Sequence, residues 1–145
     1  MSSKVSIGRK KVIQIDEKPG SIFCVTFNGP KQMDDIETYL SRFDEWLSQD
    51  KTFSLILNQI DAEAAEANRA EGSQKREAEW LRQNKPRIAQ RCDRIVMVLD
   101  SAILVEKWQP IAPKAMENMF GCSGRVFGSV SDAEQWIEEQ MSLAS

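Results

Sequence analysis

The sequence contains no histidine, and this absence excludes more chemistry than any other feature of its composition. Without an imidazole there is no Ser-His or Cys-His nucleophilic pair, no HExxH site and no His-ligated metal. An enzyme built from this chain would depend on Asp, Glu, Lys, Cys or the single tyrosine, Tyr39. We therefore expect a protein that is not an enzyme and that carries no metal and no cofactor.

Cysteine is scarce as well: Cys24, Cys92 and Cys122 are far apart, odd in number and form no CxxC pair. This pattern disfavours a zinc site or a disulfide framework and is typical of buried free thiols in a reducing compartment. No apolar run is long enough to span a bilayer, and the first 16 residues lack the apolar segment of a secretory signal. These absences predict a cytoplasmic protein without a transmembrane segment.

Charge of one sign is not concentrated, because 19 basic and 22 acidic residues give a net charge of -3. Nucleic-acid binding usually needs a strongly basic face, so we expect no nucleic-acid partner. Hydrophobic residues make up 41% of the 145 residues, which is typical of one globular domain. We predict a single domain over 1–145, with 1–10 as a flexible N-terminal segment.

The first half of the chain predicts a hairpin, a helix and a buried strand. Two β-branched and aromatic segments, 11–16 and 21–28, are separated by the turn sequence EKPG. Apolar residues recur at helical spacing over 32–49, and 53–60 is apolar enough for a strand covered on both faces.

The second half predicts alternating helices and strands. A helix-forming segment at 61–92 is interrupted by Gly72 and Pro86, where we expect it to bend or break. The remaining predicted elements are a strand at 94–100, two helical pieces within 101–121, a short strand at 124–129 and a helix at 131–144. Ser131 and Glu134 have the spacing of a capping box for that last helix.

The predicted class is α/β, with a mixed five-stranded sheet, an antiparallel edge hairpin, otherwise mostly parallel strands and four or more helices in the order ββαβαβαβα. This order resembles the STAS fold of anti-sigma-factor antagonists, and more closely the STAS-like bacterial domains of uncharacterised role, whose fold is also similar to CRAL-TRIO lipid-binding domains. Three passages carry the resemblance: IFCVTFNGP (22–30), AEWLRQNKPRIAQRCDRIVMVLDSAIL (78–104) and RVFGSVSDAEQWIEEQM (125–141).

The resemblance implies a regulatory role but does not transfer a phosphorylation site. In the antagonists, a phosphorylatable Asp-Ser pair follows the first long buried strand after the hairpin and helix. Here that strand is followed by Asp61 and Ala62, so the serine is missing. The pair Asp100-Ser101 comes one strand later and is mainly interpreted as a helix cap, with Ser101 as a minority phosphorylation site.

Two surfaces are candidates for partner or ligand binding. Apolar residues of the 101–120 segment could form a dimer face, a protein contact or a groove, or they could equally pack against the sheet as part of the core: Trp108, Ile111, Met116, Met119 and Phe120. Basic residues of the long helix could bind an anionic partner, although a solvated face with local ion pairs is the simpler interpretation: Arg76, Arg82, Lys85, Arg87 and Arg91.

The sequence therefore favours a non-enzymatic cytoplasmic regulatory or scaffolding module that acts through protein–protein contacts, either with another protein or with itself as a homodimer. The alternative is a protein that binds a lipid or an apolar small molecule in a pocket between the sheet and the 101–120 helices.

Overall fold

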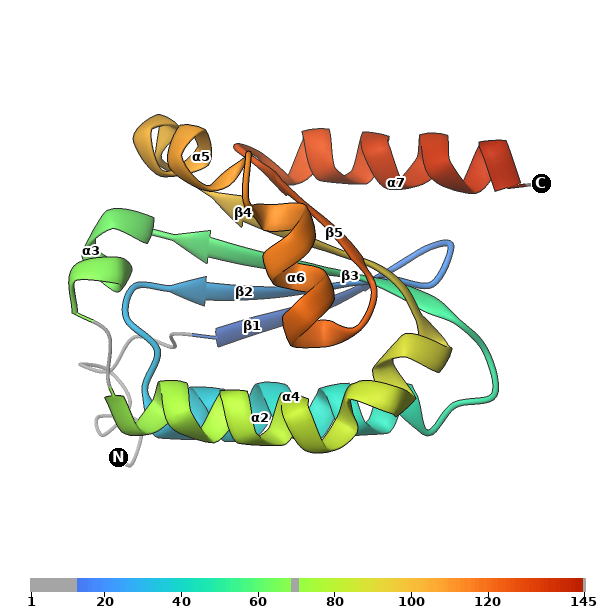
Figure 1. The fold of residues 1–145 in the computed structure, drawn as a ribbon, viewed down its shortest axis with the longest axis horizontal. Coiled ribbons are helices and arrows are strands. Elements are labelled where there is room, and N and C mark those ends of the chain that lie inside the picture. Colours follow the sequence, from blue (N-terminus) through green and yellow to red (C-terminus); the bar gives the residue numbers. More distant parts are fainter. Residues whose placement is uncertain (1–12, 69–70, 145) are drawn as a thin grey trace, which may run out of the picture.

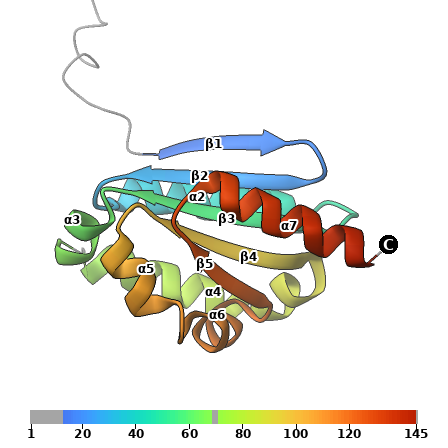
Figure 2. The ribbon, with the colours of Figure 1, turned by 90° about the horizontal axis from the view of Figure 1, so that it is seen from above.

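The computed structural model describes residues 13–68 and 71–144. Five strands form one sheet in the order β1-β2-β3-β4-β5, which is also their order in the chain. Figures 1 and 2 show α2, α4 and α6 on one face of this sheet and α7 on the other. The predicted α/β class and five-stranded mixed sheet are confirmed, whereas the predicted flexible segment 1–10 lies outside the described residues.

The hairpin and the first helix form where the sequence predicts them. Strands β1 (Ile13–Lys18) and β2 (Ile22–Asn28) are antiparallel, and the turn between them holds Gly20 and Ser21 at positive φ. Helix α2 (Met33–Leu47) then lies over the sheet and buries one apolar stripe.

The long helical segment after β3 (Phe53–Ile60) is divided into two helices, α3 (Ala62–Ala67) and α4 (Glu71–Arg91). The division precedes Gly72, and α4 continues through Pro86. Figure 1 shows the last turns of α4 bending towards β4, so the proline bends this helix and does not break it.

The remaining elements are β4 (Cys92–Leu99), α5 (Ala102–Trp108), α6 (Ala112–Phe120), β5 (Ser123–Phe127) and α7 (Val130–Ala144). The 101–121 segment thus forms two helices, as its prolines predict. Two positions now hold a pair of helices, and the order over the described residues is ββαβααβααβα rather than ββαβαβαβα.

The predicted capping box of the last helix is wrong by two residues. The hydroxyl of Ser129, not that of Ser131, accepts a hydrogen bond from the backbone N–H of Asp132 at 3.1 Å. Helix α7 therefore begins at Val130, and Ser131 is an exposed residue of its first turn.

Two apolar clusters hold the layers together. The larger one lies between the sheet and the helices of the α2 face, where aromatic rings such as Phe23 and Trp46 stack with centroids 4.4 Å apart. The smaller one lies under α7, where Ala133 and Ile137 pack on strand residues including Ile56 and Val96. Each large apolar side chain buried in this way stabilises the fold by roughly 1.5–3 kcal/mol before entropy is counted.

Candidate interaction surface at the carboxyl edge of the sheet

The carboxyl ends of β2, β3 and β4 lie at one edge of the sheet, where α3 and α5 begin. Functional sites of parallel α/β sheets are commonly found at this edge. One carboxylate organises it here: the Oδ2 and Oδ1 of Asp100 accept hydrogen bonds from the backbone N–H groups of Asp61 at 2.6 Å and Ala62 at 2.8 Å. Asp61 has a left-handed backbone (φ 57°), so these bonds hold a strained residue at the start of α3.

Ser101 caps α5, as the main interpretation of the Asp-Ser pair predicts. Its Oγ accepts a hydrogen bond from the backbone N–H of Leu104 at 3.3 Å and donates one to Oε2 of Glu63 at 2.7 Å. The residue is only 6% exposed. Phosphorylation of Ser101 stays an untested prediction, but the geometry disfavours it because a phosphate would lie against the Glu63 carboxylate.

A second carboxylate of α3 ties that helix to α5. Oε1 of Glu66 accepts a hydrogen bond from Nε1 of Trp108 at 3.2 Å, and Oε2 lies 3.3 Å from Nζ of Lys107. Sequence reasoning missed Glu63 and Glu66, although their i, i+3 spacing in an Ala-rich helix places both on one face. The two helices are therefore held together by directional polar contacts.

The predicted apolar surface of the 101–120 segment is divided by the fold. Met116 and Phe120 are 3% and 2% exposed and belong to the core, so their assignment to a contact surface is wrong. Ile111 and Met119 are exposed, and Trp108 is half-buried. Met116 lies on the side of α6 that packs directly on β5, because a Cβ at Gly124 would be only 2.5 Å from the Cβ of Met116.

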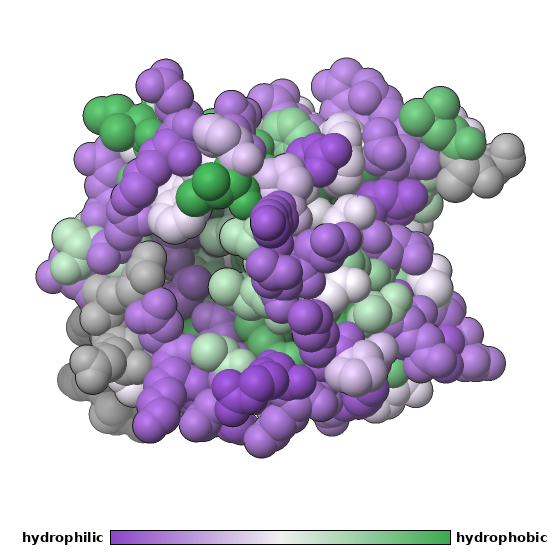
Figure 3. Space-filling view, viewed as in Figure 1, coloured by the Kyte–Doolittle hydropathy of each residue, from purple (hydrophilic) through white to green (hydrophobic). Residues whose placement is uncertain are grey.

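The most exposed apolar residue of α5 was not predicted. Ile103, in the first turn of α5, is 73% exposed. Figure 3 shows strongly hydrophobic side chains over α5 among hydrophilic neighbours. No periodicity in the sequence distinguishes this isoleucine from the buried Leu104 beside it.

The predicted basic patch is largely paired with acids. Arg76 lies 2.7 Å from Glu37 and Arg87 lies 2.7 Å from Asp44, so two of its cations bind α2. Arg91 lies 3.5 Å from Asp50, whereas Arg82 and Lys85 form no ion pair with the described residues. The hydrogen bond from Arg76 lowers the pKa of Glu37 from its usual value.

The three cysteines are buried and free. Burial raises the pKa of the Cys24 thiol and raises that of Cys92 well above its usual range. Protonated thiols are poor nucleophiles, so these residues have the character of core side chains.

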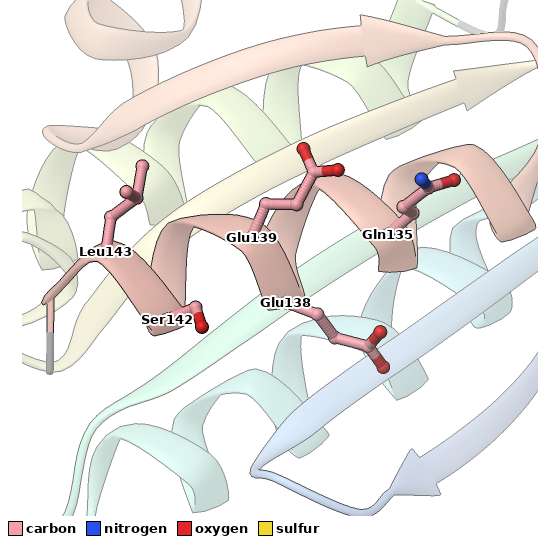
Figure 4. A pocket seen from close by; sticks show the side chains of 5 residues that line it. All are labelled: Gln135, Glu138, Glu139, Ser142 and Leu143. Carbon is pink, nitrogen blue, oxygen red and sulfur yellow. The ribbon is translucent and has the colours of Figure 1, made fainter.

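One hollow of the surface is open and shallow. Figure 4 shows this hollow of about 550 Å³, lined by residues of α7 alone, where the carboxylates of Glu138 and Glu139 point apart. Residues 13–68 and 71–144 contain no cluster of three or more potential metal ligands. None of the helices described is long and apolar enough to cross a membrane.

The fold that these elements form is the STAS-like fold predicted from the sequence resemblance. A solved structure that shares it is that of an uncharacterized protein of the DUF3478 family, with a SpoIIAA-like fold, from Shewanella loihica PV-4. The two chains are 11% identical, the TM-score is 0.59, and the similarity covers 86% of this chain and 90% of the other. No family model and no curated protein matches the sequence.

Proposed function

We propose that the protein is a non-enzymatic regulatory or scaffolding module of the cytoplasm, which acts by binding another protein through the α3–α5 surface. We define this surface as residues 61–66 and 100–111. The observation that carries the proposal is Ile103: a large apolar side chain is 73% exposed on a helix that the surrounding contacts hold in place.

The construction of the surface supports a binding role. Asp100 and Glu63 fix the starts of α3 and α5, and Glu66 fixes the end of α5. A surface that is already ordered loses little conformational entropy when a partner binds. Ile111, the residue directly before α6, adds a second exposed apolar residue to it.

The charge of the surface indicates the chemistry of the partner. Asp61, Glu63 and Glu106 are exposed acids of the same surface as Ile103, and Lys107 is an exposed cation of it. An acidic rim around an apolar centre favours a partner with an apolar anchor and basic neighbours. A second copy of this acidic surface would repel the first, so another protein is favoured over a homodimer through this face.

The experiment compares Ile103→Asp with Leu143→Asp, an equally severe change at an 80% exposed position near the end of α7. Partners are captured from native lysate by the wild type and both variants and are quantified by mass spectrometry. We expect at least one partner that wild type and Leu143→Asp capture and that Ile103→Asp does not. The melting temperature of Ile103→Asp should be unchanged. Identical partner sets for all three proteins would contradict the proposal.

A second candidate function, binding of an apolar small molecule, has one observation in its favour. Met97 lies in the central strand β4, on the sheet face that α2, α4 and α6 cover, and is in register with Leu57 and Val126. It is nevertheless only half-buried. Figure 3 shows the molecule hollowed between α3, α4 and α6. Lipid extracted from the purified protein and identified by mass spectrometry, reduced by Met97→Asp, would support this candidate.

A further inference from the structure

A hollow of about 200 Å³ lies at the amino ends of the parallel strands, at the opposite edge of the sheet from α3 and α5. Four elements meet there: the β1–β2 turn, the starts of β3 and β4, and the last part of α7, which contributes Met141. Figures 1 and 2 show the hairpin turn and the C-terminal end of α7 at this same end of the sheet. The hollow is thus enclosed by several elements, unlike the open one along α7.

Irregular backbone shapes this hollow on two sides. Gly20 and Ser21 both have positive φ (82° and 58°) and lie on its rim. The register of β3 and β4 shifts beside it, because Phe53 pairs with Cys92 while Ser54 pairs with Arg94. Asp93 is therefore the extra residue of a β-bulge, a feature that redirects side chains and is frequent next to functional sites.

The bulge decides where Arg94 points. With the shift, Arg94 pairs with Ser54 and Ser54 pairs with Ile22, so all three share the sheet face that α7 covers. Arg94 is half-buried on a central strand, and its guanidinium has no hydrogen bond or ion pair with any residue that the structure describes. Partial burial of an unpaired charge is costly, so a guanidinium in this position favours an anionic partner.

Hydroxyl groups complete the lining around Arg94. Ser54 is buried, while Ser21 and Thr52 lie nearer the surface, and each lines the same hollow. A hydroxyl donates a hydrogen bond to an anion as readily as it accepts one. The carboxylate of Asp93 is exposed at the mouth of the hollow.

We propose that this hollow binds a small molecule with a carboxylate or phosphate group, which Arg94 binds with help from the hydroxyls of Ser54, Ser21 and Thr52. A guanidinium matches both oxyanions because its fork of N–H groups forms two parallel hydrogen bonds. A volume of about 200 Å³ suits a small metabolite better than a nucleotide. Asp93 favours a ligand that also carries a hydroxyl or ammonium group, which would lie at the mouth.

The test is an amide NMR titration of the whole protein with sodium phosphate and, separately, with sodium acetate, at constant ionic strength. We expect saturable shifts at Ser21, Ser54 and Asp93, and the two anions distinguish a phosphate site from a carboxylate site. Arg94→Gln should weaken the better anion at least tenfold, whereas Arg82→Gln, which removes an exposed arginine of α4, should leave its affinity unchanged.

A conservative variant separates loss of binding from loss of structure. Arg94→Lys keeps the charge but not the fork, so its affinity should lie between those of wild type and Arg94→Gln. Shifts that do not saturate with either anion, or that are the same in wild type, Arg94→Gln and Arg94→Lys, would overturn the proposal. Protein binding at the α3–α5 surface would be unaffected by that result.

Discussion

At the scale of single residues, Gly124 has the clearest structural role. It lies in β5 directly under α6, and a Cβ at this position would lie 2.5 Å from Cβ of Met116 and 2.6 Å from its sulfur. The helix and the strand can approach each other only because this residue has no side chain. Met116 is buried on the side of α6 that faces this strand.

Gly124→Ala is therefore expected to destabilise the protein by about 1–3 kcal/mol, since overpacking forces backbone or rotamer shifts. The matched control is Gly128→Ala, where the nearest atom to an added Cβ is Cγ2 of Val105 at 4.0 Å. The control should change stability by less than about 0.5 kcal/mol. Urea unfolding measures both, and equal stabilities for the two variants would show that α6 can move away from β5.

The candidate site shows why residue-level prediction was incomplete. Ser101 was identified as a cap because a strand end followed by Asp-Ser is a local signal. Its bond to Glu63 and the bonds of Asp100 to α3 join residues 38 and 39 positions apart. Arg94 was likewise one basic residue among many in the sequence, and only the bulge at Asp93 gives it a position in the hollow.

At the scale of elements, the polar face of α4 is explained by α2. The two helices pack side by side, and the ion pairs Arg76–Glu37 and Arg87–Asp44 bridge them. Arg87 also donates to the hydroxyl of Ser48 at 3.1 Å and to the side chain of Asn84 at 2.9 Å. A basic stripe that the sequence offers as a site for an anionic partner thus serves in large part to join two helices.

Arg87→Glu should destabilise the protein by about 1 kcal/mol, because it breaks this network and places a second acid beside Asp44. Arg82→Glu, at an exposed position without an ion pair among the described residues, should stay within about 0.5 kcal/mol of wild type. Thermal unfolding of wild type, Arg87→Glu and Arg82→Glu at low and high salt measures these differences in stability. An Arg82→Glu effect as large as that of Arg87→Glu would contradict the assignment.

The same variants test the anionic-partner hypothesis for α4. Arg82 and Lys85 alone are few charges for attachment to a membrane surface. We expect wild type and both variants to sediment equally weakly with anionic vesicles. Binding by wild type that Arg82→Glu abolishes would restore that patch as a functional surface.

Element boundaries were predictable where burial alone defines the element. The strand at 53–60 was predicted to the residue, because a short run that is apolar on both faces indicates a buried strand and the polar residues around it mark both ends. The segment 61–92 divides just before Gly72 and bends at Pro86, close to where these two residues predict an interruption, whereas the contact of Asp100 with the start of α3 could not be predicted because it comes from another strand. The described residues form six helices, in agreement with the predicted four or more, and the additional ones follow from the break before Gly72 and from Pro110 and Pro113.

At the scale of the whole molecule, several ionisable groups are buried in their neutral form. Burial raises the pKa of the Cys24 and Cys92 thiols from a usual value of 9.0, and that of the Tyr39 hydroxyl well above 10.0. In the unfolded chain these groups lose their protons at their usual pKa. The unfolded state therefore binds fewer protons than the folded state at alkaline pH.

The free energy of unfolding should consequently be independent of these groups below about pH 8 and fall as pH rises above 9. Each thiol that stays protonated in the folded state adds a slope of about 1.4 kcal/mol per pH unit in that range. Urea unfolding between pH 7 and 10.5 measures the slope, and Cys92→Ala should reduce it. A profile that Cys92→Ala leaves unchanged would mean that this thiol ionises equally in both states.

The order of the strands has a consequence for synthesis of the protein. Because chain order and sheet order are the same, each strand emerges from the ribosome next to the strand with which it pairs, and the sheet can grow in one direction. Its second face, with Ile22, Ile56 and Val96, stays uncovered until Ala133 and Ile137 of α7, which follow the strands in the chain, have been synthesised. A nascent chain that stalls before residue 130 would therefore expose the apolar residues of one face of a nearly complete sheet. This is the form that chaperones bind and that aggregates most readily.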